Sequence, residues 1–219
     1  MKYVIWASFF FVPISLQAIT IGFDSAPRSL DPRYAVDANS QYFEDLLHCS
    51  LISYDPQGKL INQLAQSISW EGDKVCVVEI RGDVKFADGS LVSPEDVKAT
   101  YDFFLQDAKI PSPRRQAFRA VEKIEQLGNK IKFYLKAPDA AFVSNLVIGI
   151  LPKEVAFSDP QNEKITPRTC GPYTFDSRLV NQIVLKRNEH HIPKVVSKIL
   201  TIKVIQDEIT RAAKLEKGE

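Results

Sequence analysis

The chain has 219 residues, of which 45% are hydrophobic and 25% are charged, with 28 basic and 27 acidic residues and a formal net charge of +1. This is the balance of an ordinary soluble globular protein, and the length allows one large domain or two small ones. The near-neutral charge, without a basic run or an acidic tail, gives no case for binding nucleic acid or an anionic membrane surface.

Residues 1–18 differ from the rest of the chain. Lys2 is their only charge, and it is followed by the apolar run Tyr3–Val12 and by a small or polar stretch that ends at Ala18. This is the layout of a secretory signal peptide, and the apolar part is shorter than a membrane span requires. We expect cleavage after Ala18. Because Ile19 is not a cysteine, we also expect a free periplasmic protein without a lipid anchor; an uncleaved membrane anchor is the alternative.

Short strands and helices alternate along the remaining sequence, which predicts an α/β or mixed α+β fold. The expected strands are Ile19–Phe23, Leu51–Tyr54, Lys74–Ile80, Val121–Leu127, Lys130–Leu135, Tyr173–Phe175, Gln182–Lys186 and Ile199–Ile205. The expected helices are Ser40–Leu47, a segment that begins after Ser93, Ala140–Ile148 and a final helix capped by Asp207. Turn-forming residues fill Asp24–Pro32, which predicts a loop after the first strand.

The segment Val75–Leu105 carries the clearest local signals. Asp88-Gly89 indicates a turn, and Ser93-Pro94-Glu95-Asp96 indicates the start of a helix. Ser93 is a capping residue, proline suits the first helical position, and acidic residues suit the positive end of the helix dipole. None of these features is catalytic, so the segment predicts a scaffold.

The chain contains the three cysteines Cys49, Cys76 and Cys170. An odd number in an exported protein leaves at least one thiol unpaired within the chain, or paired outside it. Cys76 lies inside a predicted strand and fits a small buried hydrophobic residue. The sequence does not choose among the pairings of these three residues.

Five stretches in order resemble the extracellular solute-binding proteins of ABC importers, family 5, which take up dipeptides, oligopeptides and, in some members, nickel. The most specific of these stretches is Arg81-x-x-Val84-x-Phe86-x-Asp88-Gly89 followed by Ser93-Pro94-Glu95-Asp96-Val97. The others are Ser29-Leu30-Asp31-Pro32, Leu64-Ala65-Gln66-Ser67 with Trp70, Ile131–Leu135 with Ala137-Pro138, and Cys170-Gly171-Pro172-Tyr173 with Leu185-Lys186-Arg187-Asn188.

The resemblance implies a periplasmic binding protein-like lobe with a smaller inserted domain. Residues 19–38 and 151–219 would form the discontinuous first lobe and residues 39–150 the inserted domain, after the signal peptide 1–18. Members of the family continue with a second lobe, so we expect this chain to be an N-terminal portion whose missing lobe leaves apolar surface exposed. The expected role is capture of a peptide or another small solute for an inner-membrane ABC permease, without enzymatic activity or a cofactor.

The resemblance also suggests site residues. In such proteins a ligand is enclosed between two lobes, and the loop after the first strand is the expected wall of the cleft. Here this loop contains Asp24, Ser25, Ala26 and Pro27, with Asp24 as the candidate group for a ligand's amino end; a solvated turn is the alternative. Cys170, Gly171, Pro172 and Tyr173 match the family's G-T-G-P-[FY] segment near the hinge, which we interpret as structural.

Three alternative interpretations of the sequence are a metal site, an enzyme and a half-protein that does not bind ligand. His190-His191 replaces the family's usual Tyr-Trp pair, but adjacent residues of a strand face opposite ways and His48 is the only other histidine, so we expect no metal site. A cysteine hydrolase that uses Cys170, a histidine and Asp176 is an enzyme alternative, although no local motif supports it. A half-protein that contacts the permease without binding ligand is the other alternative.

Overall fold

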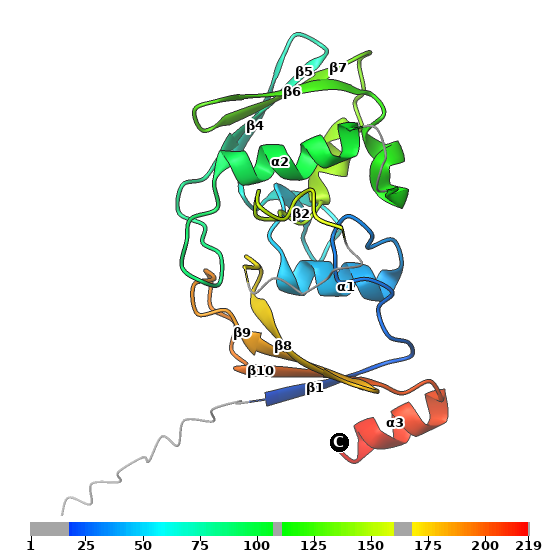
Figure 1. Cartoon of the computed structure of the whole chain (residues 1–219). Coiled ribbons are helices and arrows are strands. Elements are labelled where there is room, and N and C mark those ends of the chain that lie inside the picture. The colour runs from blue at the N-terminus through cyan, green and yellow to red at the C-terminus, as the bar shows by residue number, and fades with distance from the viewer. Residues whose placement is uncertain (1–17, 107–110, 160–167, 219) are drawn as a thin grey trace, which may run out of the picture.

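The structure, a computed structural model, describes residues 18–106, 111–159 and 168–218. Figure 1 shows two sheets at opposite ends of the molecule, with the helices Ala38–Leu47 and Pro94–Leu105 between them. The strands are β1 (Ala18–Phe23), β2 (Ile52–Tyr54), β3 (Leu60–Asn62), β4 (Ala65–Glu71), β5 (Val75–Ile80), β6 (Val121–Leu127), β7 (Lys130–Leu135), β8 (Tyr173–Leu179), β9 (Gln182–Arg187) and β10 (Ile199–Val204). The helices are α1 (Ala38–Leu47), α2 (Pro94–Leu105) and α3 (Glu208–Glu216), with 3-10 helices η1 (Pro113–Phe118) and η2 (Phe142–Val147). The fold is therefore mixed α/β, as expected.

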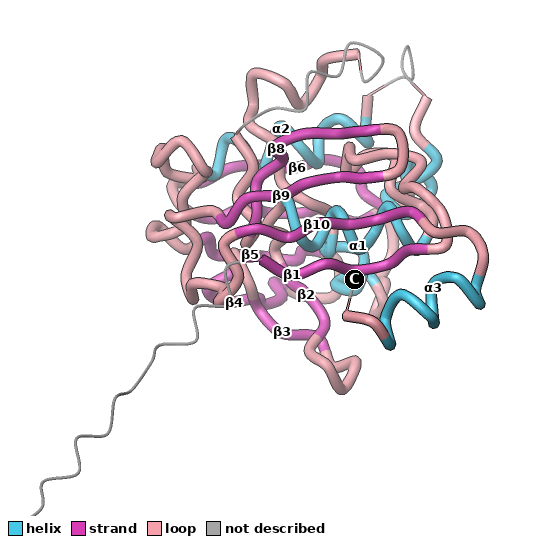
Figure 2. Tube along the Cα trace, turned by 90° about the horizontal axis from the view of Figure 1, so that it is seen from below, coloured by secondary structure: helices cyan, strands magenta, loops and turns pink. Residues whose placement is uncertain are grey.

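The first sheet joins the two ends of the described chain. Its strand order is β1-β10-β9-β8, with β1 and β10 parallel and the other pairs antiparallel (Figure 2). The inward-facing side chains of this sheet pack against α1 in one apolar cluster, which contains Leu30, Phe43, Leu47, Tyr173, Ile183, Leu185, Leu200 and Ile202. Helix α1 thus packs against both Leu30 of the loop after β1 and the inner face of this sheet.

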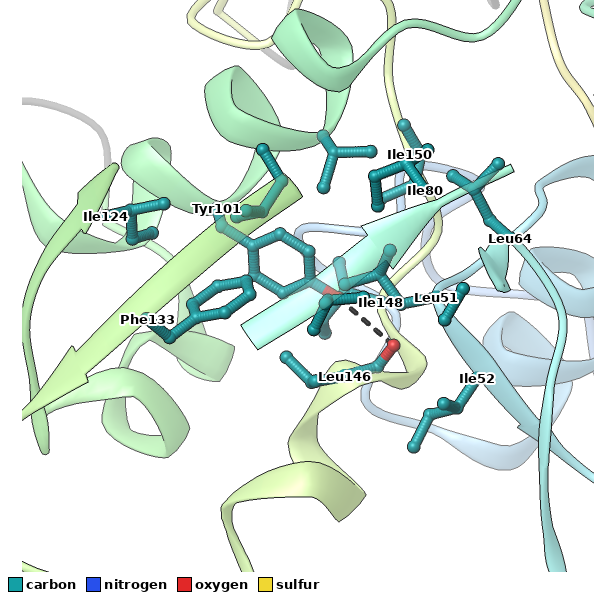
Figure 3. Packing of buried hydrophobic residues seen from close by; sticks show 14 of the residues in the cluster. Leu51, Ile52, Leu64, Ile80, Tyr101, Ile124, Phe133, Leu146, Ile148 and Ile150 are labelled. Atoms are coloured by element: carbon teal, nitrogen blue, oxygen red, sulfur yellow. Dashed lines mark hydrogen bonds between the residues drawn. The ribbon is translucent and has the colours of Figure 1, made fainter. Parts of the chain in front are cut away.

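The second sheet has the order β4-β5-β7-β6, and α2 packs against β6 and β7 (Figure 1). Tyr101 of α2 is fully buried, with its ring in edge contact with Phe133 and Phe118. Its hydroxyl donates to the carbonyl of Leu146 at 3.1 Å, so this buried polar group keeps a partner (Figure 3). The two short strands β2 and β3 form a separate ribbon.

Local signals explain most element boundaries. Helix α2 begins with a reciprocal capping box in which Ser93 and Asp96 each bind the other's backbone N–H. The hairpin β6–β7 has the predicted bounds and turns at Gly128, which has a positive φ of 61°. The final helix is capped by Asp207, as predicted.

Some elements differ from the expectation. Strands β3 and β4 were not expected, because β4 is an edge strand whose mostly exposed residues do not alternate cleanly. The expected helix Ala140–Ile148 is a 3-10 helix, Phe142–Val147, interrupted by non-helical backbone at Leu146.

The predicted signal peptide also lies outside the described residues, apart from Ala18, which begins β1. No helix in the described part of the chain has the length and apolar content that crossing a membrane requires. The predicted domain limits at 38/39 and 150/151 stay predictions. Helix α1, which lies almost wholly after the first of these limits, packs on the sheet formed by β1 and β8–β10.

Candidate functional site

The loop after β1 places three exposed residues at the surface beside the start of α1. The Asp24 carboxylate accepts hydrogen bonds from the Asn39 amide and the Ser25 hydroxyl, both at 3.1 Å. The same Asn39 amide donates to the Ser25 carbonyl at 2.9 Å. The hydrogen bond from Asn39, followed by that from the Ser25 hydroxyl, lowers the pKa of Asp24 below its ordinary value. The carboxyl group is therefore an anion at neutral pH. The loop therefore presents a positioned carboxylate to solvent.

The loop is fastened to α1 behind this carboxylate. Asp37 caps the helix by accepting the Ser40 N–H at 3.0 Å, and it also accepts the Ser40 hydroxyl at 2.6 Å. The Ser29 N–H in turn donates to the Ser40 hydroxyl at 3.1 Å. Asp24, Ser25 and Ala26 are exposed, whereas Pro27 is buried. Of the four predicted contact residues, only the first three offer surface, and ligand contact stays a prediction for all four.

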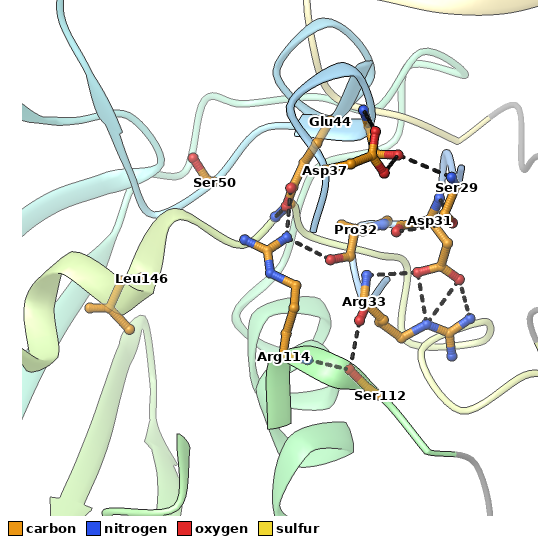
Figure 4. Close-up of polar contacts among 12 residues, drawn as sticks. Ser29, Asp31, Pro32, Arg33, Asp37, Glu44, Ser50, Ser112, Arg114 and Leu146 are labelled. Atoms are coloured by element: carbon orange, nitrogen blue, oxygen red, sulfur yellow. Dashed lines mark hydrogen bonds and ion pairs between the residues drawn. The ribbon is translucent and has the colours of Figure 1, made fainter. Parts of the chain in front are cut away.

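A buried ion pair holds the next turn of the chain. Arg33 is 2% exposed and forms a bidentate pair with Asp31, whose carboxylate also accepts the Arg33 N–H at 2.8 Å (Figure 4). The same guanidinium donates to the carbonyls of Ala156 and Ser158 at 3.0 and 2.9 Å. Because the charge is paired and its donors are used, Arg33 can stay buried and join the loop to residues 156–158.

A second buried pair joins α1 to η1. Arg114 donates to the Glu44 carboxylate at 2.6 Å and to the Pro32 carbonyl at 2.7 Å, and the Gly149 N–H donates to the other carboxylate oxygen at 2.7 Å (Figure 4). Burial raises the pKa of Glu44 to about 7, against the opposing effect of Arg114. This pair fixes α1 relative to the loop after β1, to η1 and to Gly149.

The predicted hinge segment lies where three passes of the chain cross. Cys170 forms a disulfide with Cys49, which follows α1, and Cys76 is left as a free, buried thiol whose pKa burial raises to about 12. The Gly171 N–H donates to the Leu47 carbonyl at 2.9 Å, and the Ile150 N–H donates to the Cys49 carbonyl at 2.8 Å. The structure thus selects one of the open cysteine pairings and gives Cys170 and Gly171 structural contacts.

The remaining residues of the predicted hinge segment also make contacts at this crossing. The Asn188 side chain donates to the Gly171 carbonyl at 2.9 Å, the Asn188 N–H donates to the Pro172 carbonyl at 2.9 Å, and Tyr173 packs in the core of the first sheet. A hollow beside the disulfide, lined in part by Arg81, Lys85, His190 and His191, encloses only about 40 Å³. Ligand pockets usually exceed about 300 Å³, so this hollow is too small to be a pocket for a solute.

The histidines and the disulfide bear on the two chemical alternatives. Within the described ranges, no group of three or more His, Cys, Asp or Glu side chains is arranged to hold a metal ion. His48 is buried, and its pKa is lowered by burial, whereas His190 is exposed. Cys170 is fully buried in the disulfide and Asp176 pairs with Lys186, so the thiolate that the hydrolase hypothesis requires is absent.

Comparison with known proteins identifies the class of protein. The sequence profile of the bacterial extracellular solute-binding proteins, family 5 (middle region), matches residues 59–219. The chain belongs to this family. It is 32% identical over 206 residues to the glutathione-binding protein GsiB of Pectobacterium atrosepticum, and 27% identical over 215 residues to the oligopeptide-binding protein AppA of Bacillus subtilis. These matches cover 87% and 92% of the chain but 38% and 39% of the relatives, so the chain spans about two fifths of their length.

Solved structures of this family agree with the fold. The structure of AppA from Bacillus subtilis in complex with a nonapeptide superposes with a TM-score of 0.85 at 26% identity, over 92% of this chain and 42% of that one. NikZ from Campylobacter jejuni in complex with Ni(L-His) gives a TM-score of 0.79 at 28% identity, over 94% and 42% of the two chains. The periplasmic binding protein-like architecture is therefore present in part.

Sequence reasoning missed two features of the site. Asn39, which positions Asp24, is an ordinary polar residue near a helix start and gives no signal of its partner. Glu44 did give a signal, because it lies beside Phe43 and three residues before Leu47, close to the apolar face of its helix. A carboxylate in that position predicts a buried partner, but the sequence does not name Arg114 as that partner.

Proposed function

We propose that this chain is a substrate-binding component of an ABC importer, exported to the periplasm, that contributes one wall of a cleft for a peptide or another small solute. Membership of family 5 carries this proposal, and the exposed loop of Asp24, Ser25 and Ala26 supports it. The ligands for which the relatives are named, an oligopeptide for AppA and glutathione for GsiB, both carry a free amino group and an amide backbone. A carboxylate held in place by Asn39 suits such an amino group.

The proposed role involves binding and release only, with an inner-membrane permease as the partner. The chain spans about two fifths of its relatives, so it supplies part of the contacts that would enclose a ligand. We therefore expect weak binding by this chain alone, since affinity depends on enclosure and preorganisation. A chain that contacts the permease without binding ligand is the alternative.

Calorimetric titration with a tripeptide, with the same peptide acetylated at its amino end, and with glutathione tests the proposal. We expect acetylation of the peptide to raise its Kd by up to about fivefold, because the acetylated peptide cannot form an ion pair with Asp24. Loss of one surface ion pair changes an equilibrium constant by about that factor at most. Asp24→Asn should remove this difference, whereas Asp73→Asn, an equal change of charge on the exposed β4–β5 turn, should keep it. Absence of binding for all three solutes would refute ligand capture by this chain and favour the permease-contacting alternative.

A further inference from the structure

An exposed aromatic side chain stands beside the loop that contains Asp24. Tyr42, on α1, is 59% exposed, and the next most exposed aromatic side chain in the described ranges, Tyr54, is 54% exposed. The Tyr42 ring meets the ring of Phe23 in a tilted contact, with the centroids 5.9 Å apart. Tyrosine combines a large apolar ring with a polar end, and it is enriched where proteins bind other molecules.

Two connections place this ring on the same side of α1 as Asp24. The Asn39 amide donates to the Asp24 carboxylate at 3.1 Å, and Tyr42 follows Asn39 by three residues along the helix. Side chains three apart on a helix are neighbours, with Cβ atoms about 5–6 Å apart. The second connection is Phe23, which contacts Tyr42 and directly precedes Asp24 in the chain. The carboxylate and the ring therefore belong to one surface.

Phe23 supports Tyr42 from the side of the core. Its ring also meets that of Phe43 nearly edge-on, with the centroids 6.0 Å apart and an interplanar angle of 82°, and Phe43 is fully buried. This contact orders the Tyr42 ring while leaving more than half of the side chain open to solvent. A tyrosine has only two side-chain torsions, so fixing it in a complex costs little conformational entropy.

The charges beside Tyr42 are acidic. Asp24 lies on one side, and the exposed Asp45 follows Tyr42 by three residues along α1 on the other. A cation paired with Asp24 would lie beside an aromatic ring, whose face attracts positive charge. An anion there would be repelled by both carboxylates. The surface is therefore complementary to an amino group on a carbon that carries an apolar side chain.

We propose that Tyr42 sets the specificity of the Asp24 loop by packing against the first side chain of a peptide whose amino group pairs with Asp24. The amino group and this side chain share one carbon, so a peptide anchored at Asp24 brings its first side chain to the neighbouring ring. The preferred ligands are peptides with a large apolar or aromatic first residue. Glutathione is disfavoured, because its amino-bearing carbon carries a carboxylate. This inference rests on the proposed function, since it concerns the same loop.

Calorimetric titration of the chain with Phe-Gly-Gly and with Gly-Gly-Gly tests the proposal. We expect Phe-Gly-Gly to bind about threefold to tenfold more tightly, which is the contribution of one aromatic contact. Tyr42→Ala should bring the ratio of the two Kd values close to one, whereas Tyr42→Phe keeps the ring and should preserve the ratio. Tyr54→Ala removes a similarly exposed tyrosine from β2 and should also preserve it.

The ratio of Kd values separates a specificity role from a structural one. If Tyr42→Ala only disturbed the packing on Phe23, both Kd values would rise by the same factor, and the unchanged ratio would overturn the proposal. The wild-type ratio needs no variant, so the proposal stays testable even if Tyr42→Ala fails to fold.

The same titrations distinguish failure of this inference from failure of the proposed function. Equal binding of the two peptides by the wild type, weakened for both by Asp24→Asn, would refute the role of Tyr42 and leave solute capture standing. No binding of either peptide would refute both. S-methylglutathione, which has no thiol to exchange with the disulfide, should bind more weakly than Gly-Gly-Gly. Tighter binding of it than of Phe-Gly-Gly would overturn the proposed ligand class.

Discussion

Gly171 occupies the position in the hinge segment where the chain leaves least room for a side chain. A Cβ at this residue would stand 2.5 Å from the Leu47 carbonyl carbon and 2.7 Å from the His48 nitrogen, both of them backbone atoms. Gly171→Ala should therefore force the crossing apart and lower the free energy of unfolding by about 1–3 kcal/mol. Gly82→Ala is the matched control, because nothing lies within 4 Å of its Cβ position and its φ is not positive. Urea unfolding that shows equal effects for the two variants would contradict a tight backbone crossing at Gly171.

Glu44 predicts a dependence of stability on pH. Its pKa is 4.5 in an unfolded chain and about 7 in the folded protein, mainly because of burial. Between these values the folded state binds more protons than the unfolded state. The contribution of Glu44 to the free energy of unfolding therefore falls as pH rises from about 4.5 to about 7, by an amount on the order of 2 kcal/mol.

His48 acts in the opposite sense, because burial lowers its pKa and its contribution is lost as pH falls below about 6.5. The test is therefore the difference between the unfolding free energies of the wild type and Glu44→Gln, measured across this pH range. We expect this difference to change between pH 4.5 and pH 7 by the amount given above for Glu44, on the order of 2 kcal/mol. A difference that stays constant would show that Arg114 keeps Glu44 ionised throughout.

At the scale of elements, two helices with similar caps should respond differently to loss of the cap. Ser93 caps α2, whose inner face is buried against β6 and β7, whereas Asp207 caps α3, which has no buried residue. Ser93→Ala should lower the free energy of unfolding by about 1 kcal/mol. Asp207→Ala should change it by less than about 0.5 kcal/mol, because fraying of α3 breaks little of the core. Equal losses in chemical unfolding would mean that α3 packs more firmly than its exposure indicates.

The elements also show what the sequence could predict. Strands β1, β5, β6, β7, β9 and β10 and the helices α1, α2 and α3 were expected within one or two residues, because their caps, turns and periodic apolar residues are local signals. Strand β4 could not be predicted, because an exposed edge strand has no clear apolar pattern. The pairing of β1 with β10 could not be predicted either, because contacts between residues distant in sequence leave no local pattern. At the candidate site, the resemblance to the family predicts the loop at Asp24. The contact of Asn39 with Asp24 and the Cys49–Cys170 pairing are visible only in the folded structure.

At the scale of the whole molecule, the disulfide closes a loop that contains the second sheet, β4–β7, and helix α2. Cys49 and Cys170 are separated by 121 residues and join the end of α1 to the segment that returns to the first sheet. Replacing both by alanine should lower the free energy of unfolding by about 2–5 kcal/mol, through the added freedom of the unfolded chain. Cys76→Ala leaves the disulfide intact and should cost about 1 kcal/mol or less. Similar losses for the two variants in thermal unfolding would contradict a stabilising role for the disulfide.

Solute capture at the loop after β1 can be observed by NMR titration of the isotope-labelled chain with a tripeptide. We predict that the backbone amides of Asp24, Ser25 and Ala26 shift in proportion to added peptide, together with the side-chain amide of Asn39. The amides of Gly58 and Gly82, on exposed segments away from this loop, should not move. Shifts confined to other segments, or none up to the solubility limit of the peptide, would contradict the assignment of this loop as a ligand-binding wall.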